Sequence, residues 1–318
     1  MAFTPIFKGF SKKPRSQYFR AGPLGGHNVC RTFPHHHLNP LTQPPSQMIR
    51  DQLPIGTWLA IGALLQGLLS FLPYRNLLLI LPVLALLAFK LLTTALQTLN
   101  LIPNPWIADA IPNRTAILYA NEHGEYENPG DQAICTIMLA ARSNHPLGML
   151  GPGFKEVGDR FTVMTRELDA DPTTHGYLGS STWLNSSDRT SGNEQMVLMY
   201  FKSLAACHAY AHGPQHTATM LWWQQNAHKM KHVGIMHEIY AAPKHASEGI
   251  YVNYHPTGLG ATFTEARVGK EGERVWMSPL VQGKGRLTYS KGRMGRGLDE
   301  KTEWAAFEET LGKEDGRY

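Results

Sequence analysis

The sequence contains little cysteine and little charge, and it lacks the common catalytic signatures. Its three cysteines, Cys30, Cys135 and Cys207, have no metal-ligand spacing, which excludes a disulfide scaffold and a Cys-x-x-Cys zinc site and favours a reducing compartment. Charged residues make up 17% of the chain, below the ~25% typical of soluble domains, so we expect a lipid-facing part. No glycine-rich nucleotide loop, GxSxG or HExxH motif occurs, so the usual nucleotide-binding and hydrolase signatures are absent.

Acidic residues are missing from the front of the chain. Residues 1–50 hold seven Lys or Arg and no Asp or Glu, whereas the remainder holds 23 basic and 25 acidic residues. A chain that is basic only at its front is not typical of a nucleic-acid-binding domain, and we expect no nucleic-acid partner. Residues 1–53 mix Pro, Gly, Ser and His without apolar periodicity, which predicts a disordered basic arm. A mitochondrial presequence is the alternative interpretation of this arm.

Two long apolar runs follow the arm. Residues 55–72 carry no formal charge, and a second run from 77 to 89 continues past Lys90. Each is close to the ~20 residues that span a bilayer, so residues 54–98 are predicted to form a transmembrane helical hairpin in which Lys90 snorkels. The alternatives are a hairpin that enters only one leaflet and a helical hairpin buried in a soluble core. The basic residues before the first run place the N-terminus in the cytosol, and two spans return the C-terminus there. The endoplasmic reticulum is the expected membrane.

Residues 104–265 show the patterns of an α+β domain. Periodicity predicts strands at 132–143, 177–186, 194–203, 232–243 and 248–256, and helices at 154–168, 204–212 and 215–226. The order β-α-β-β-α-β is that of a ferredoxin-like sheet with its helices on one face. No further element remains to cover the other face, so we expect a homodimer.

The remaining residues, 266–318, return to glycine and charge. Residues 282–297 contain five basic residues, five glycines and no acid, with Tyr289 as the only aromatic residue. This composition favours a polar, mostly flexible tail over an RNA-binding one.

Histidine is the residue type that most suggests a site. His208 and His212, and again His228 and His232, have the i, i+4 spacing that places two imidazoles on one helix face. A helix break follows His212 at once, and no carboxylate accompanies either pair, so no metal is predicted.

His237 has a different setting, within the predicted strand 232–243. Alternation places His237 on one face of that strand and Glu238 on the other. An imidazole on a core strand is either a hydrogen-bonded structural residue or a general base, and both interpretations stay open. Asn144, just after the first strand, is a candidate hydrogen-bond donor to a developing oxyanion, or simply a turn residue.

Aromatic residues of the same domain are candidates for an apolar substrate pocket, although each is also a candidate for core packing. They are Trp183, Tyr200, Trp222 and Trp223.

Four segments carry a resemblance to a known family. They are NHPLGMLGPGF (144–154), YFKSLAACHAYAHGPQH (200–216), GIMHEIY (234–240) and YVNYHPTGLG (251–260). They resemble a fungal family of antibiotic-biosynthesis-type monooxygenases that includes an enzyme oxidising a polyketide chain in the fumagillin pathway. The wider superfamily forms dimeric α/β barrels from ferredoxin-like protomers, and the resemblance covers roughly 104–263.

The resemblance implies a membrane-anchored oxygenase that takes O2 as co-substrate and needs no metal, haem or flavin. Its substrate would be a lipophilic polyketide or polyene, with His237, Glu238, Asn144 and His145 as candidate catalytic residues. One alternative is a haem-dependent or cofactor-free lyase or cyclase on the same barrel, with His237 or His145 as the axial ligand of a haem iron. Another is a non-enzymatic, membrane-tethered binding protein.

Overall fold

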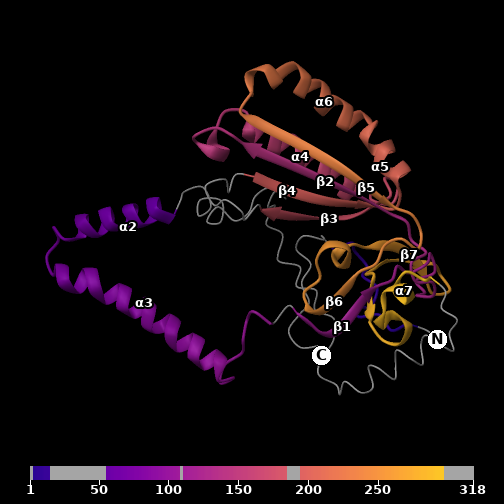
Figure 1. The fold of residues 1–318 in the computed structure, drawn as a ribbon, viewed down its shortest axis with the longest axis horizontal. Coiled ribbons are helices and arrows are strands. Elements are labelled where there is room, and N and C mark those ends of the chain that lie inside the picture. Colours follow the sequence, from indigo (N-terminus) through magenta and orange to yellow (C-terminus); the bar gives the residue numbers. More distant parts are fainter. Residues whose placement is uncertain (1–2, 15–54, 108–109, 185–193, 297–318) are drawn as a thin grey trace.

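The structure is a computed structural model that describes residues 3–14, 55–107, 110–184 and 194–296. Figure 1 shows a pair of helices on one side, a sheet layered with helices, and a smaller unit of short strands below that sheet. The predicted disorder of residues 15–53, and the tail beyond residue 296, lie outside the described residues.

The main sheet has the ferredoxin-like arrangement that the sequence predicted. Its strand order is β3-β4-β2-β5 and every pairing is antiparallel. The strands are β2 (Ile134–Ser143), β3 (Tyr177–Leu184), β4 (Glu194–Phe201) and β5 (Val233–Ala242). Three helices lie over one face: α4 (Phe154–Ala170), α5 (Leu204–Ala211) and α6 (Pro214–Asn226).

The core of this domain lies between the sheet and the helices. Alternation along β2 and β4 points Cys135 and Phe201 to the helix side, where they pack with Leu168 of α4, Cys207 of α5 and Tyr177. All five are buried, and full burial of a large apolar side chain stabilises a fold by about 1.5–3 kcal/mol. The helix-covered face is therefore the well-packed face of the domain.

A second unit, built mainly of short β-strands, lies beside the main sheet, and it shows that the prediction of a flexible tail was wrong for residues 266–296. One sheet has the order β6-β1-β9, and β7 pairs with β8 beside it. These strands are β1 (Ile111–Ile117), β6 (Ile250–Tyr254), β7 (Thr264–Val268), β8 (Glu273–Met277) and β9 (Leu280–Gln282). Their core contains Ala116, Leu118, Val281 and Leu287, all buried.

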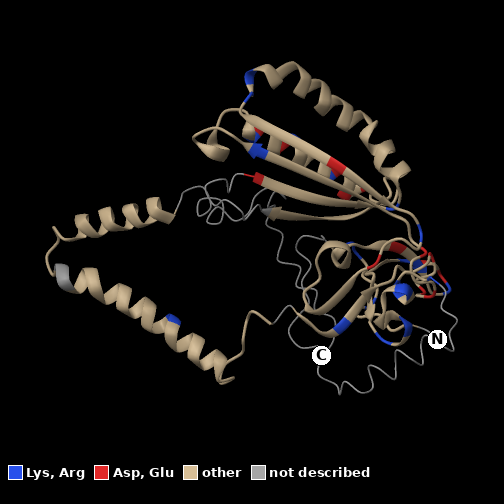
Figure 2. Cartoon of the chain, in the orientation of Figure 1, with Lys and Arg blue, Asp and Glu red and all other residues tan. Residues whose placement is uncertain are grey.

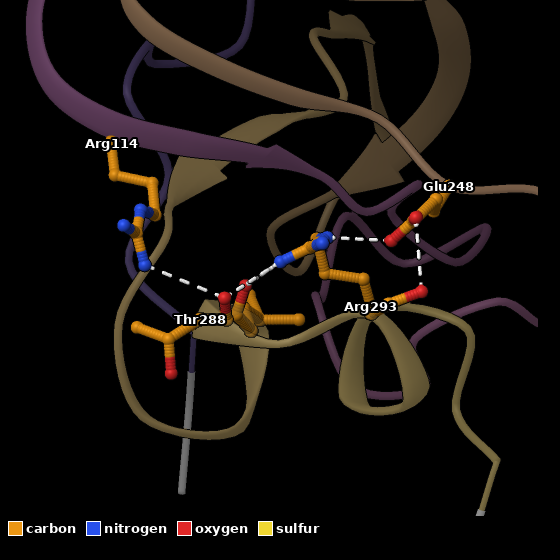
Figure 3. A network of polar contacts seen from close by, with 6 residues as sticks. Arg114, Glu248, Thr288 and Arg293 are labelled. Carbon is orange, nitrogen blue, oxygen red and sulfur yellow. Dashed lines mark hydrogen bonds and ion pairs between the residues drawn. The ribbon is translucent and has the colours of Figure 1, made fainter. Parts of the chain in front are cut away.

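The basic glycine-rich segment is ordered, and one of its arginines, Arg293, forms hydrogen bonds inside the second unit (Figure 3). The Arg293 guanidinium is buried; it donates to the carbonyl oxygens of Leu287 and Thr288 at 3.0 and 2.8 Å and to the Glu248 carboxylate at 2.8 Å. Arg114 donates to the same Thr288 carbonyl at 3.4 Å. A buried charge is tolerated when it is paired and hydrogen-bonded in this way. Composition alone does not reveal that this arginine has partners.

The start of the predicted disordered arm is also part of the fold. Ile6 N donates to the Leu280 carbonyl at 2.9 Å, and Phe10 and Trp276 exchange backbone hydrogen bonds of 2.9 and 2.7 Å. The Phe10 ring meets Phe263 edge-on at 5.7 Å. Residues 3–14 thus form an N-terminal strip on the second unit. The sequence-based prediction was wrong here because the strip's partners lie at the other end of the chain.

Lys13 fastens this strip to the ferredoxin-like domain. Its Nζ lies 4.6 Å from the centre of the Tyr177 ring and 3.8 Å from the Asp169 carboxylate of α4. Burial lowers the pKa of Lys13 to about 8, and the charge of Asp169 only partly opposes that shift. The strip therefore contacts both units.

The second unit also covers one end of the face of the main sheet that carries no helix. Leu259 of the 3₁₀ turn Gly258–Ala261, together with Tyr119, packs against Leu178 and Tyr200. The expectation that no element remains to cover this face was therefore wrong for that end. The other end stays uncovered by the described residues, and Trp183 there is 40% exposed.

The helical pair comprises α2 (Ile55–Leu69) and α3 (Arg75–Thr98), and Figure 2 shows it almost free of charge. Of the described helices, one is long and apolar enough to cross a membrane: residues Leu77–Thr98, none of them buried. The 15 residues of α2 extend about 22 Å, less than the ~30 Å of a hydrocarbon core. One membrane-crossing helix is thus supported, and the two-span hairpin is not confirmed.

Candidate functional site

The structure divides the candidate site residues into three groups, set by the sheet. His237 lies on the helix-covered face, because it is paired with Leu139 of β2 and shares that face with Ile239. Glu238 is paired with Met138 and points to the opposite face, as alternation predicted. His237 is exposed although it sits in the middle of β5. An accessible imidazole therefore lies within the otherwise packed helix side.

Helix α6 provides the surroundings of His237. Its inward face is only half-buried and carries Trp222, Trp223 and His216. Burial lowers the pKa of His216, and the nearby His237 and His212 lower it further, while the Ala211 carbonyl opposes the shift. Two imidazoles, one on α6 and one on β5, are thus close enough to interact electrostatically. Sequence reasoning missed His216, although it lies in the segment HGPQH that carried the resemblance.

Trp222 is oriented by helix α4. The Arg160 guanidinium lies 4.1 Å from the centre of the Trp222 ring, a cation–π contact that joins α4 to α6. Ile235, on the same face of β5 as His237, is 48% exposed. We call Ile235, His237, His216, Trp222 and Trp223 the helix-side surface. It combines apolar side chains with two groups able to accept a proton.

Asn144 and His145 form the second group, at the end of the sheet where β2 ends. The backbone N–H of Asn144 donates to the His232 carbonyl at 2.7 Å, and the ring of His145 lies 5.0 Å from that of His232. His145 Nδ1 accepts a hydrogen bond from the Leu147 amide at 3.1 Å, so its Nε2 carries the proton in the neutral tautomer. A neutral imidazole held in this way is a donor at Nε2 rather than a metal ligand.

The third group lies on the face opposite the helices. Trp183 donates to the Ser181 hydroxyl at 3.3 Å, and the Tyr240 hydroxyl donates a very short hydrogen bond to Glu238. That bond raises the pKa of Tyr240. Tyr200 is buried beneath the second unit, and burial raises its pKa too. The predicted pocket residues Trp183 and Tyr200 are therefore separated from His237 by the sheet.

Metal-binding chemistry finds no support among the described residues, which contain no cluster of three His, Cys, Asp or Glu side chains suited to an ion. His208 lies on α5, but its partner His212 caps that helix. His228 lies in a 3₁₀ turn and His232 precedes β5, so the second pair is not on a helix face either.

Comparison with known proteins gives one strong match. Residues 134–259 match the family model described as monooxygenase af470-like. Over 254 residues the chain is 32% identical to monooxygenase af470 of Aspergillus fumigatus, an alignment that covers 79% of this chain and 90% of that protein.

Similarity to solved structures is more distant. An aldoxime dehydratase crystallised with butyraldoxime matches with a TM-score of 0.34 and 13% identity, over 46% of this chain and 39% of its own length. The cofactor-independent oxygenase SnoaB of Streptomyces nogalater, in a mutant form, matches with a TM-score of 0.25 and 9% identity, over 34% of this chain and 92% of its own.

The environment of His216 predicts a pH-dependent stability. The pKa of His216 is lowered in the folded protein, so below about pH 6.5 the unfolded chain binds more protons than the folded one. The free energy of unfolding therefore decreases as the pH is lowered through this range. Denaturant titrations in detergent should show a smaller loss between about pH 7 and about pH 5.5 for His216→Gln than for the wild type. His123→Gln, at an exposed histidine of a surface loop, is the control. Equal losses in the wild type and His216→Gln would contradict the assignment.

Proposed function

Since the chain belongs to the monooxygenase af470-like family, we propose that it oxidises a lipophilic polyketide or polyene with O2, without a cofactor, while anchored to a membrane. The observation that carries this proposal is the accessible His237 imidazole on the helix-covered face of the sheet, near His216 of α6, a helix that also carries two half-buried tryptophans. Such a surface offers a base and an apolar contact area to a large unsaturated substrate. The enzyme is a monooxygenase by family, and the substrate, cofactor and location are the proposed part.

The chemistry needs a base and an electron-rich substrate. His237 accepts a proton from an activated CH2 group, and the resulting carbanion donates electrons to O2. The new C–O bond gives a peroxide anion, whose outer oxygen atom takes the proton back from His237. The peroxide then loses its outer O–H group together with the second hydrogen of the carbon, as water. One oxygen atom stays in the product as a carbonyl group and the other leaves as water. The two electrons needed to reduce that second oxygen atom come from the substrate carbon, so no further reductant is required.

The membrane anchor follows from the exposed apolar surface of α3 and from the strip hydrogen bonds. Residues 3–14 precede the helical pair, yet they pair with β8 and β9, which follow it. This pairing supports a helical pair whose two open ends lie on the same side of the membrane. We infer that α2 and α3 enter and return on the same side. The seven basic residues of the arm place that side in the cytosol, with the endoplasmic reticulum as the proposed membrane.

A homodimer accounts for the uncovered part of the main sheet. Register places the apolar Met138, Met196, Leu198 and Met236 on this open face, together with Trp183. Met236 is 39% exposed, and an exposed apolar area of this kind is typical of an interaction surface. The resemblance to dimeric α/β barrels supports a second copy as the partner.

The role of His237 is tested by turnover. His237→Ala should lower O2 consumption with polyene substrates by about 100-fold or more, measured on metal-stripped protein, because the base is lost. His237→Gln keeps a hydrogen-bonding side chain but cannot serve as a base, and should be equally slow. His123→Gln, at an exposed histidine of a surface loop, is the control. Near-normal turnover with a lowered melting temperature would instead make His237 structural, and a Soret band in the purified protein would favour the haem alternative.

Membrane insertion is tested by extraction. The wild type should stay in the pellet after an alkaline carbonate wash, whereas Leu84→Arg/Leu87→Arg should be released, since each arginine at a helix centre costs roughly 3 kcal/mol. Leu101→Arg, at an exposed leucine just outside α3, should behave like the wild type. A wild type that washes off would rule out the anchor.

Two substitutions in β5, one on each face of the sheet, test the dimer. Met236→Asp should convert the detergent-solubilised dimer to a monomer, because a charge is placed in the interface. Ile235→Asp changes the neighbouring residue, which points to the helix side, and should leave the mass unchanged. Light scattering with detergent correction distinguishes the two, and a wild-type monomer would exclude this interface.

A further inference from the structure

Two loops meet at the end of the main sheet where β2 ends and β5 begins. We call residues 144–153 and 227–232 the loop-end surface. His232 connects the two loops through two contacts. Its carbonyl oxygen accepts a hydrogen bond from the backbone N–H of Asn144 at 2.7 Å, and its Nε2 lies 2.7 Å from the Pro152 carbonyl oxygen. The buried Met230 packs directly against Gly153, which has no room for a Cβ atom. The two loops therefore form one fixed surface.

This surface presents two leucines to the outside. Leu147 and Leu150 are 61% and 78% exposed; Leu147 directly precedes the 3₁₀ turn Gly148–Leu150, Leu150 ends it, and Met149 between them is buried. The turn is held by the Ser143 hydroxyl, which donates to the Gly148 carbonyl at 2.6 Å. The leucines are thus displayed by an ordered turn, and their exposure costs free energy unless something apolar receives them.

The second loop of this surface carries positive charge. Lys229 and Lys231 are exposed, and neither takes part in an ion pair with another described residue. The other two cations nearby are already paired, Lys155 with Asp159 and Arg142 with Glu194. An apolar tip beside free lysines matches the chemistry of a bilayer surface, where acyl chains lie beneath anionic headgroups.

The surface is also on the appropriate side of the molecule. In Figure 1 the loop between β2 and α4 and the turn between α6 and β5 lie at the end of the sheet that is directed toward the helical pair. Both open ends of that pair, the start of α2 and the end of α3, are directed toward the body of the protein. A membrane that receives the helices would therefore pass close to the loop-end surface.

We propose that the loop-end surface docks onto the anionic lipid surface of the membrane, with Leu147 and Leu150 inserted below the headgroups and Lys229 and Lys231 among them. The proposal rests on the membrane anchor of the proposed function. It gives the lipophilic substrate a route, because His237 lies four residues into β5 from this end, about 13 Å along the strand. Substrate dissolved in the bilayer reaches the helix-side surface without passing through water.

Depth measurements on the full chain in lipid vesicles test this. A nitroxide is attached at Leu150→Cys in a Cys30→Ser background, since Cys135 and Cys207 are buried. In phosphatidylcholine vesicles containing phosphatidylserine, the label should collide more with O2, which concentrates in lipid, than with a water-soluble nickel chelate. A label at Lys270→Cys, in the exposed turn between β7 and β8, should show the reverse preference.

Charge reversal provides the second part of the test. Lys229→Glu/Lys231→Glu should move the label at position 150 into water, as should omission of phosphatidylserine, whereas Lys270→Glu/Lys284→Glu should leave it in lipid. A label at 150 that reports water in the parent overturns the proposal, and insensitivity to the lysines overturns their role. Carbonate extraction of the same vesicles separates the outcomes: retained protein with a water-exposed label refutes docking alone, and released protein refutes the anchor.

Discussion

Antiparallel pairing of β2 with β4 on one side and β5 on the other is the constraint on which the rest of the structure depends. Residues opposite each other in such a ladder share a face, and successive residues alternate. The pairing of Leu139 with His237 therefore fixes the imidazole on the helix side, and the next pair, Met138 with Glu238, is fixed on the open side. A slip of one residue would exchange the two faces. The register thus separates the helix-side surface from the open face of the sheet.

The second unit depends on contacts between distant parts of the chain. Strand β1 lies before the main sheet in sequence and β6 to β9 lie after it, while the N-terminal strip comes from before the helical pair. Lys13 and the turn Gly258–Ala261 then join this unit to the main sheet. In sequence, the ferredoxin-like domain is consequently inserted between β1 and β6 of the second unit, which packs against one end of its sheet.

Periodicity predicted the main sheet well, because its elements depend on local patterns. The helical periodicity of residues 154–168 and the assignment of His237 and Glu238 to opposite faces of β5 are readable within single segments, and both were confirmed. Most of the second unit was missed, although β6 lies within the predicted strand 248–256, because its strands are short and the segment that follows them is rich in glycine and charge. Arg293 also looks like a solvated residue until its partners are known. His216 was missed for a related reason: its proximity to His237 joins a helix and a strand that no local pattern connects. The site assignments themselves stay predictions.

The position of the N-terminal strip has a consequence for biosynthesis. The ribosome makes residues 3–14 first, but the backbone groups that they bind, at Trp276 and Leu280, are among the last to be made. By then the apolar helices have long left the ribosome, and domains generally fold in the order of their synthesis. The strip must therefore wait unpaired until β8 and β9 have been made. Completion of the second unit is thus a late step in folding, and a fusion partner placed before the strip would sit beside the segment on which that step depends.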